Sequence, residues 1–171
     1  MKKIIIAIDS FKGCLTSAEA GKAAEKGIKS INPFCHTSVI PIADGGEGLL
    51  DVLITATKGK YITLSAHGPL MKMAKTHYGL SGNGRTAIIE MAAISGLPLV
   101  PIEQRNPMLT TTFGTGELIK DALNKGCRNF IIGIGGSATN DAGLGMLQAL
   151  GFRFLDKSGH TLGTGGQIID R

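Results

Sequence analysis

The sequence is poor in several residue types, and each shortage argues against a class of protein. Only 5% of the 171 residues are aromatic and Trp is absent, so a base-stacking surface for single-stranded nucleic acid is not expected. The cysteines (Cys14, Cys35 and Cys127) show no C-x-x-C spacing, which argues against a disulfide framework or a zinc site and indicates reduced thiols in a cytoplasmic protein. The apolar run at residues 4–8 is too short for a signal peptide or a membrane span.

Familiar catalytic signatures are missing as well. The chain contains no Walker A pattern and no H-R-D or D-F-G sequence, so a kinase activity would belong to neither of those two large classes. Its histidines are scattered and Ser137 lies outside any G-x-S-x-G elbow, which argues against a histidine metal site and an α/β-hydrolase. The net charge of +5 comes from dispersed Lys and Arg residues, a pattern typical of a solvated surface rather than a nucleic-acid patch.

Hydrophobic residues make up 43% of the chain and glycines number 25, enough for a packed core with many tight turns. The β-branched run at residues 4–8 and the run "NFIIGI" at 129–134 are typical of buried parallel strands. Thr16 and Glu19 have the spacing of a capping box, which predicts that a helix begins there. Segments between residues 60 and 91 alternate apolar and polar residues, which indicates short strands with antiparallel pairing.

These patterns predict an α/β fold. We expect a Rossmann-like parallel sheet flanked by helices, with a β-rich α/β second domain or insertion. Residues 1–60 would form the first α/β segment, and residues 61–171 the β-rich and α/β segment that contains the glycine-rich loop. The segment "FRFLD" at 152–156 is expected to add one more strand.

Three polar loops follow predicted elements of this fold. They are "DSFKG" at residues 9–13, "ADGGEG" at 43–48 and "GGSATND" at 135–141. Ligands of open α/β sheets bind beyond the carboxyl ends of the strands. If the strands are neighbours, the three loops converge on one site.

The third loop has the features of a phosphate site. Gly135 and Gly136 allow a close backbone approach, and the loop leads into a predicted helix whose N–H groups and dipole favour an anion. The polar side chains of the loop belong to Ser137, Thr139, Asn140 and Asp141. A tight glycine turn followed by a simple helix cap explains the same residues, so both interpretations stay open.

The same loop also matches a dinucleotide fingerprint. Gly133, Gly135 and Ala138 fit G-x-G-x-x-A, and Asp156 lies near the spacing of a ribose-binding acid. A nicotinamide-dependent oxidoreductase is therefore an alternative hypothesis. Against it, polar side chains crowd the turn and the motif does not follow the first strand, its usual place.

The other loops supply charges that phosphoryl transfer needs: a divalent metal, a cation on the transferred group and a group that orients the hydroxyl. Asp44 and Glu47 flank two glycines and have the hard oxygen ligands that suit Mg²⁺. Lys12 offers a charge for a phosphate, and the planar fork of Arg105 suits a carboxylate. Each of these residues can instead be a helix cap or an ordinary surface residue.

With these loops in view, the sequence resembles the glycerate kinase family. The matching stretches run in the family's order over nearly the whole chain and are "IAIDSFKG", "LTSAEA", "PIADGGEG", "AIIEMAAISGL", "EQRNPMLTTTFGTGELI" and "IIGIGGSATNDAGLGMLQALG". The resemblance implies ATP-dependent phosphorylation of D-glycerate to 2-phosphoglycerate with Mg²⁺, in a cleft between two α/β domains. Family members are more than twice as long, so the chain resembles their N-terminal part.

Roles within this resemblance are assigned by chemistry. Lys12, Asp44 and Asp141 are predicted to be catalytic, with Asp44 and Glu47 as ligands of Mg²⁺. The predicted substrate and phosphate contacts are Asp9, Ser10, Gly45, Gly46, Arg105, Gly135, Gly136, Ser137, Thr139 and Asn140. The expected partner is a small molecule, D-glycerate, with no nucleic acid and no membrane, in a cytoplasmic protein that is free to form a homo-oligomer. A third hypothesis is that the chain alone is an inactive ligand-binding fragment.

Overall fold

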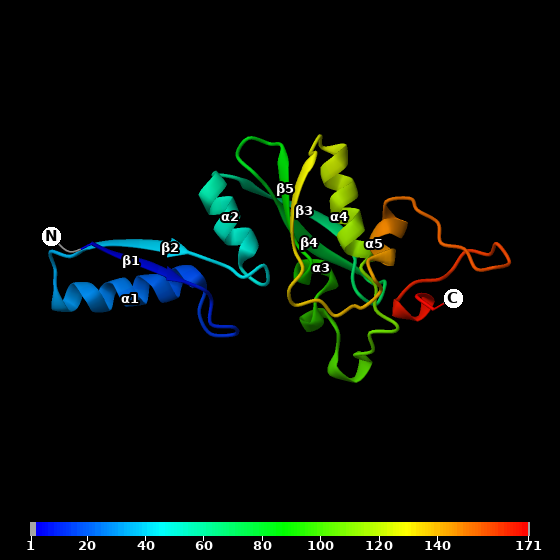
Figure 1. Ribbon diagram of the computed structural model, residues 1–171, viewed down its shortest axis with the longest axis horizontal. Helices are drawn as coiled ribbons and strands as arrows, with labels where there is room; N and C mark the ends of the chain where they lie inside the picture. The colour runs from blue at the N-terminus through cyan, green and yellow to red at the C-terminus, as the bar shows by residue number, and fades with distance from the viewer. Residues whose placement is uncertain (1–2, 171) are drawn as a thin grey trace.

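Two sheets organise the chain in the computed structural model, which describes residues 3–170 (Figure 1). The first is a parallel pair, β1 (Lys3–Ile8) and β2 (His36–Pro41), joined by helix α1 (Ser17–Ile31). The second has the order β3 (Lys60–His67), β4 (Met73–Leu80), β5 (Thr86–Glu90) and β6 (Asn129–Gly133). The predicted α/β class is confirmed, but its parallel strands lie in two sheets rather than one.

The capping box predicted at the start of α1 is present. Thr16 Oγ1 accepts a hydrogen bond from the backbone N–H of Glu19, whose carboxylate accepts one from the N–H of Thr16 at 2.8 Å. A Cβ on Gly21 would lie 2.3 Å from Val39 Cγ1, so the helix approaches the sheet closely because this residue has no side chain. Ser17 Oγ donates to the carbonyl of Ile8 and accepts from a backbone N–H that follows β2. The start of α1 therefore ties the ends of both strands together.

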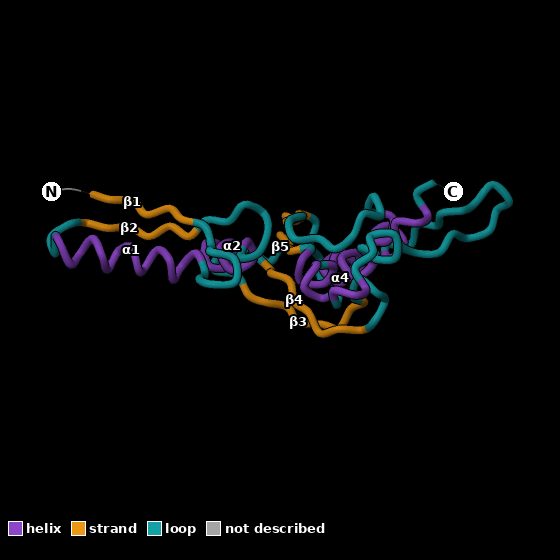
Figure 2. Tube along the Cα trace, turned by 90° about the horizontal axis from the view of Figure 1, so that it is seen from below, coloured by secondary structure: helices purple, strands orange, loops and turns teal. Residues whose placement is uncertain are grey.

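Only one face of the β1–β2 sheet is covered within residues 3–170. Figure 2 shows α1 on one side of the two strands and no described element on the other. Ile5 and Ile40, which point to the uncovered side, are 59% and 48% exposed. Parallel sheets normally bury both faces, so this unit has an unusually apolar surface.

The second sheet pairs its strands in two ways. β3, β4 and β5 are antiparallel neighbours, as the alternation over residues 60–91 predicted, whereas β5 and β6 are parallel. Helix α4 (Phe113–Asn124) packs on β3 and β5, and α2 (Leu49–Thr57) packs on β4 and β5. α2 thus belongs by its packing to the second sheet, although it precedes that sheet in the sequence.

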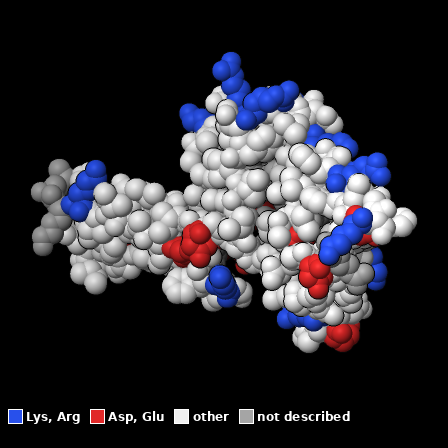
Figure 3. Space-filling view, turned by 45° about the vertical axis from the view of Figure 1, so that its right-hand side comes forward, with Lys and Arg blue, Asp and Glu red and all other residues white. Residues whose placement is uncertain are grey.

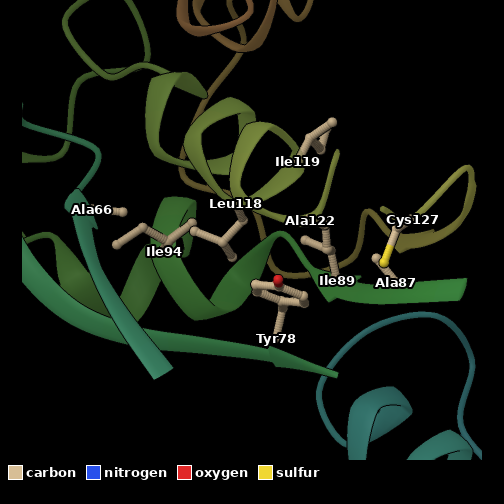
Figure 4. Close-up of a cluster of buried hydrophobic side chains, with 9 residues drawn as sticks. All are labelled: Ala66, Tyr78, Ala87, Ile89, Ile94, Leu118, Ile119, Ala122 and Cys127. Carbon is tan, nitrogen blue, oxygen red and sulfur yellow. The ribbon is translucent and has the colours of Figure 1, made fainter. Parts of the chain in front are cut away.

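The main core lies between the second sheet and α4 (Figure 4). Ala87 and Ile89 of β5 are fully buried in it, while Ile88 between them is buried against α2 on the other face. This alternation follows from the strand's period of two. Tyr78 is also fully buried, and its hydroxyl donates to Asp121 Oδ2 at 2.8 Å. Burial, and then this bond, raise the pKa of Tyr78.

Short elements complete the described chain. They are α3 (Ala92–Ser95), α5 (Leu144–Ala149) and three 3₁₀ turns at Leu97–Leu99, Ile102–Gln104 and Gly166–Ile168. The strand expected at 152–156 is absent; Leu155 forms only an isolated bridge with Thr161. The β1–β2 sheet and α1 form the first unit, which projects in Figure 3 as a narrow arm from a wider body. Lys and Arg side chains are dispersed over this face. None of the helices within residues 3–170 has the length and apolar character needed to cross a bilayer.

Candidate active site

A cavity of about 670 Å³ lies between the first unit and the second sheet. The β1–α1 loop forms one wall, and the end of β2 and helix α2 form the others. Its charged lining comprises Lys12, Glu19, Glu47, Asp51 and Glu90, with His77 beside them. Two of the three polar loops singled out in the sequence therefore contribute to one cavity.

The first loop presents a lysine to this cavity. A bridge between Phe11 and Leu15, with Phe11 N–H donating to Leu15 O at 2.9 Å, closes a tight turn around Lys12. Lys12 is exposed and makes no ion pair with any residue between 3 and 170. Ser10 also lines the cavity. Asp9 does not line it, and its carboxylate accepts the N–H of Ser10 at 2.7 Å. The lysine is thus the cation that this loop offers to an anionic ligand.

The second and third loops touch backbone to backbone. Gly135 N–H donates to Gly45 O at 3.1 Å. A Cβ on Gly135 would lie 2.7 Å from Gly46 Cα, and one on Gly133 would lie 2.6 Å from Gly45 O. Side chains at these positions would separate the loops, so glycine is needed here for the contact between them. Their predicted role as phosphate contacts stays a prediction.

The acidic residues of the second loop are exposed. Asp44 Oδ1 accepts the N–H of Gly46 at 3.0 Å, and its second oxygen makes no hydrogen bond with any residue between 3 and 170. Glu47 lines the cavity and has no recorded hydrogen bond or ion pair within the described chain. Both carboxylates are therefore accessible to a ligand.

Asp141 has a different environment. It is 1% exposed and accepts the backbone N–H of Thr112 at 2.8 Å, that of Gly143 at 3.0 Å and that of Gly145 at 3.2 Å. The hydroxyls of Thr111 and Thr112 donate to it as well. These bonds join the start of α4 to the start of α5. They occupy the N–H groups of Gly143 and Gly145 at the start of α5, where a phosphate was expected. Its predicted catalytic role is untested, and this geometry favours a positioning role.

The remaining polar residues of the third loop hold the loop in shape. Ser137 Oγ lies 2.8 Å from Thr139 Oγ1 and accepts the N–H of Thr139 at 3.0 Å. Thr110 Oγ1 and the backbone of α3 hold Ala138 between them. Gly136 and Asn140 are exposed, but the third loop does not line the cavity.

Arg105 lies apart from the cavity. It follows the second 3₁₀ turn on an exposed loop, and its Nε–H donates to Val100 O at 3.3 Å. The structure does not bring it together with Lys12 or Glu47 in the cavity wall. Of the predicted contacts, it is the one with the least structural support.

Glu90 is a cavity residue that sequence reasoning missed. It ends β5, is half-buried, and accepts the N–H of Leu50 at 2.7 Å. Burial raises its pKa above the ordinary value, and the negative charge of Asp51 acts in the same direction. Tyr61 donates to Asp51 in turn, a bond that raises the pKa of Tyr61 to about 12. The signal in the sequence was an acidic residue at the end of a buried apolar run.

The geometry around Gly133 does not form a dinucleotide turn. The loop after β6 runs to Gly143 before α5 begins at Leu144, whereas the fingerprint opens directly into a helix. Asp156 accepts the N–H groups of Ser158 and His160 within its own turn. The G-x-G-x-x-A match is therefore incidental to the fold.

Comparison with known proteins gives a consistent result. The model of the glycerate kinase family matches residues 4–171. The chain is 56% identical to a glycerate kinase of Bacillus subtilis (strain 168), over 99% of this chain and 44% of that protein. It is 51% identical to the glycerate 2-kinase of Escherichia coli (strain K12), over 98% of this chain and 44% of that protein.

A solved structure agrees. The crystal structure of a protein assigned as glycerate kinase 2 from Salmonella typhimurium LT2 superposes with a TM-score of 0.83 at 48% identity, over 98% of this chain and 45% of that one. The chain therefore spans less than half the length of these relatives. The match of sequence and fold over almost all of its residues shows that the chain belongs to the glycerate kinase family.

Proposed function

We propose that this chain supplies the reactant-binding loops of an enzyme that phosphorylates D-glycerate with ATP and Mg²⁺, giving 2-phosphoglycerate. The observation that carries the proposal is the meeting of the loops. Lys12 and Glu47 face one cavity, and the loop that holds Glu47 is in backbone contact with the third loop at Gly135. The names of the relatives, glycerate kinase and glycerate 2-kinase, support the choice of substrate.

Magnesium fits the residues that are present. Within residues 3–170 no three or more His, Cys, Asp or Glu side chains gather to hold a metal by themselves. Mg²⁺ usually needs only one or two carboxylates, because waters and substrate phosphates complete its shell. Asp44 and Glu47 would supply these carboxylates. When bound, the ion neutralises phosphate charge during transfer.

The residues of the chain would divide the remaining work. The free ammonium of Lys12 would bind the oxygens of the transferred phosphoryl group, where negative charge is concentrated. The open oxygen of Asp44 is also suited to orienting the glycerate hydroxyl. Gly136 and its neighbours in the third loop would hold further phosphate oxygens through backbone N–H groups, whereas the N–H of Gly135 is already bound to Gly45 O. A cytoplasmic location belongs to the same proposal, because the cysteines of the sequence lack the spacing of a disulfide framework.

The proposal is tested by assaying the protein in its natural length with ATP, Mg²⁺ and D-glycerate. Glycerate-dependent ADP formation is expected, and phosphorus NMR of the product should show the 2-phosphate ester. Lys12→Ala and Asp44→Asn should each lower kcat by at least ~100-fold, as loss of electrostatic groups typically does. The control is Lys29→Ala, which removes an exposed lysine of α1 that pairs with Glu25. No ADP above the level without glycerate would reject the activity.

Binding by the 171-residue chain can be followed separately from turnover. Cys14 lines the cavity and is exposed, whereas Cys35 and Cys127 are buried. Alkylation of Cys14 by iodoacetamide should slow when MgATP or D-glycerate occupies the cavity. Protection without ADP formation is the result that the fragment hypothesis predicts.

A further inference from the structure

Helix α2 begins without a cap of its own. Its N-cap is Gly48, at φ 92° with no side chain to accept the first N–H groups. An N-cap side chain usually accepts a hydrogen bond from one of these N–H groups. The residues just before the cap form the Asp44 and Glu47 loop that the proposed function requires.

Glu90 supplies the missing acceptor from another element. Its Oε1 accepts the N–H of Leu50 at 2.7 Å, across 40 residues of sequence, and the N–H of Gly48 also interacts with this carboxylate. Glu90 lines the same cavity as Lys12 and Glu47. The end of β5 is thereby fixed to the start of α2.

Met91, the residue after Glu90, fixes the position of the third loop. Met91 N–H donates at 2.9 Å to the carbonyl of Gly133, the last residue of β6, just before the third loop. Gly135 N–H donates to Gly45 O in the second loop. One short segment, residues 90–91, therefore holds the second loop through a side chain and the third loop through its backbone.

We propose that Glu90 is a positioning residue: its carboxylate caps α2 and so sets the place of the Asp44 and Glu47 loop against the third loop and the cavity. This inference rests on the proposed function, because it assumes that the loop holds reactants. Displacing a catalytic group by as little as ~1 Å can cost on the order of 100-fold in rate. The role requires an acceptor at Leu50 N–H and does not require that Glu90 touch a substrate.

The test compares Glu90→Ala and Glu90→Gln in the protein of natural length. We expect Glu90→Ala to lower kcat by about 100-fold while KM for ATP and glycerate changes less than about threefold. Glu90→Gln should restore most of the rate, because its amide oxygen can still accept the Leu50 N–H. Hydrogen exchange of amides 45–50 should accelerate in Glu90→Ala and stay near wild type in Glu90→Gln.

The matched control is Glu117→Ala. Glu117 also accepts a backbone N–H from a distant element, that of His67 at 2.7 Å, but lies outside the cavity. The Glu117→Ala variant should have a lower melting temperature but should not show the loss of kcat expected for Glu90→Ala. Equal activity of Glu90→Ala and Glu117→Ala would overturn the inference, as would a Glu90→Gln as inactive as the alanine variant. If the wild type forms no ADP, the proposed function fails, and the exchange of amides 45–50 still decides whether Glu90 positions the loop.

Discussion

Asp44 and Asp141, both predicted from the sequence to be catalytic, have opposite environments: one is exposed and the other is buried. Asp44 is exposed; one of its oxygens accepts the N–H of Gly46, and its carboxylate is accessible to a ligand. Asp141 is buried, and backbone N–H groups and threonine hydroxyls surround its carboxylate. A carboxylate with these internal donors is suited to holding structure together, whereas an accessible one is suited to chemistry.

Asp141→Ala should be strongly destabilising because it leaves the N–H groups of Thr112 and Gly145, which are buried, and of the half-buried Gly143 without an acceptor. We expect the free energy of unfolding to fall by about 2–4 kcal/mol. The measurement is urea unfolding followed by circular dichroism. Asp44→Ala is the matched control, and it should change stability by less than about 0.5 kcal/mol because its site is exposed. Similar losses in both variants would contradict the distinction drawn between the two residues.

At the scale of elements, the second and third loops pack together through close backbone contacts rather than through side chains. The second and third loops meet at Gly45, Gly46 and Gly135, and residues 90–91 bind the end of the second loop and the strand end before the third. Glycines in a loop are often assigned to a ligand, but here the neighbouring backbone already needs the space. A single added methyl group therefore tests the contact.

Gly135→Ala should push the two loops apart, because its Cβ would meet Gly46 Cα at 2.7 Å. We expect a loss of at least ~10-fold in the ADP-forming activity, because small displacements cost rate. The Gly135 amide, which donates to Gly45 O, should also exchange faster. Gly27→Ala is the control: its Cβ would meet nothing within 4 Å on the exposed face of α1. It should raise stability by up to about 1 kcal/mol. Unchanged activity and exchange in Gly135→Ala would show that the loops adjust without cost.

At the scale of the whole molecule, the described chain has an uneven surface. The second sheet is covered by α4 on one face and α2 on the other, whereas the first sheet is covered only by α1 (Figure 1). Ile5 and Ile40 leave an apolar strip on the bare side. This strip sits on the arm that also carries Lys12.

The 171-residue chain should therefore bind an apolar dye such as anilinonaphthalene sulfonate in its native state. Ile5→Thr with Ile40→Thr should lower the fluorescence without loss of stability, because both side chains are already about half exposed. Ile6→Thr is the contrasting variant, since Ile6 is 8% exposed and faces α1. It should destabilise the chain, as burying an isoleucine contributes about 1.5–3 kcal/mol. Dye binding that is unchanged in the double variant would place the apolar site elsewhere.

Much of the fold could be predicted because its signals are local. The capping box at Thr16, the strand at residues 4–8 and the antiparallel strands between 60 and 91 each follow from residues that are close in sequence. Hydrophobic period and hydrogen bonds across a few residues decide such features before any long-range contact forms. The strand expected at 152–156 failed because its apolar residues found no neighbouring strand beyond one bridge.

Local patterns could not decide which elements share a sheet or which side chains share a cavity. Glu90 reaches Leu50 across 40 residues and Asp141 reaches Thr112 across 29. The burial of Asp141 and the accessibility of Asp44 depend on such contacts, because burial and hydrogen bonding come from neighbours in space. By itself the sequence determined most of the elements, the three polar loops and the family resemblance. Only the tertiary structure decided that two of these loops face one cavity and that the third packs against the second.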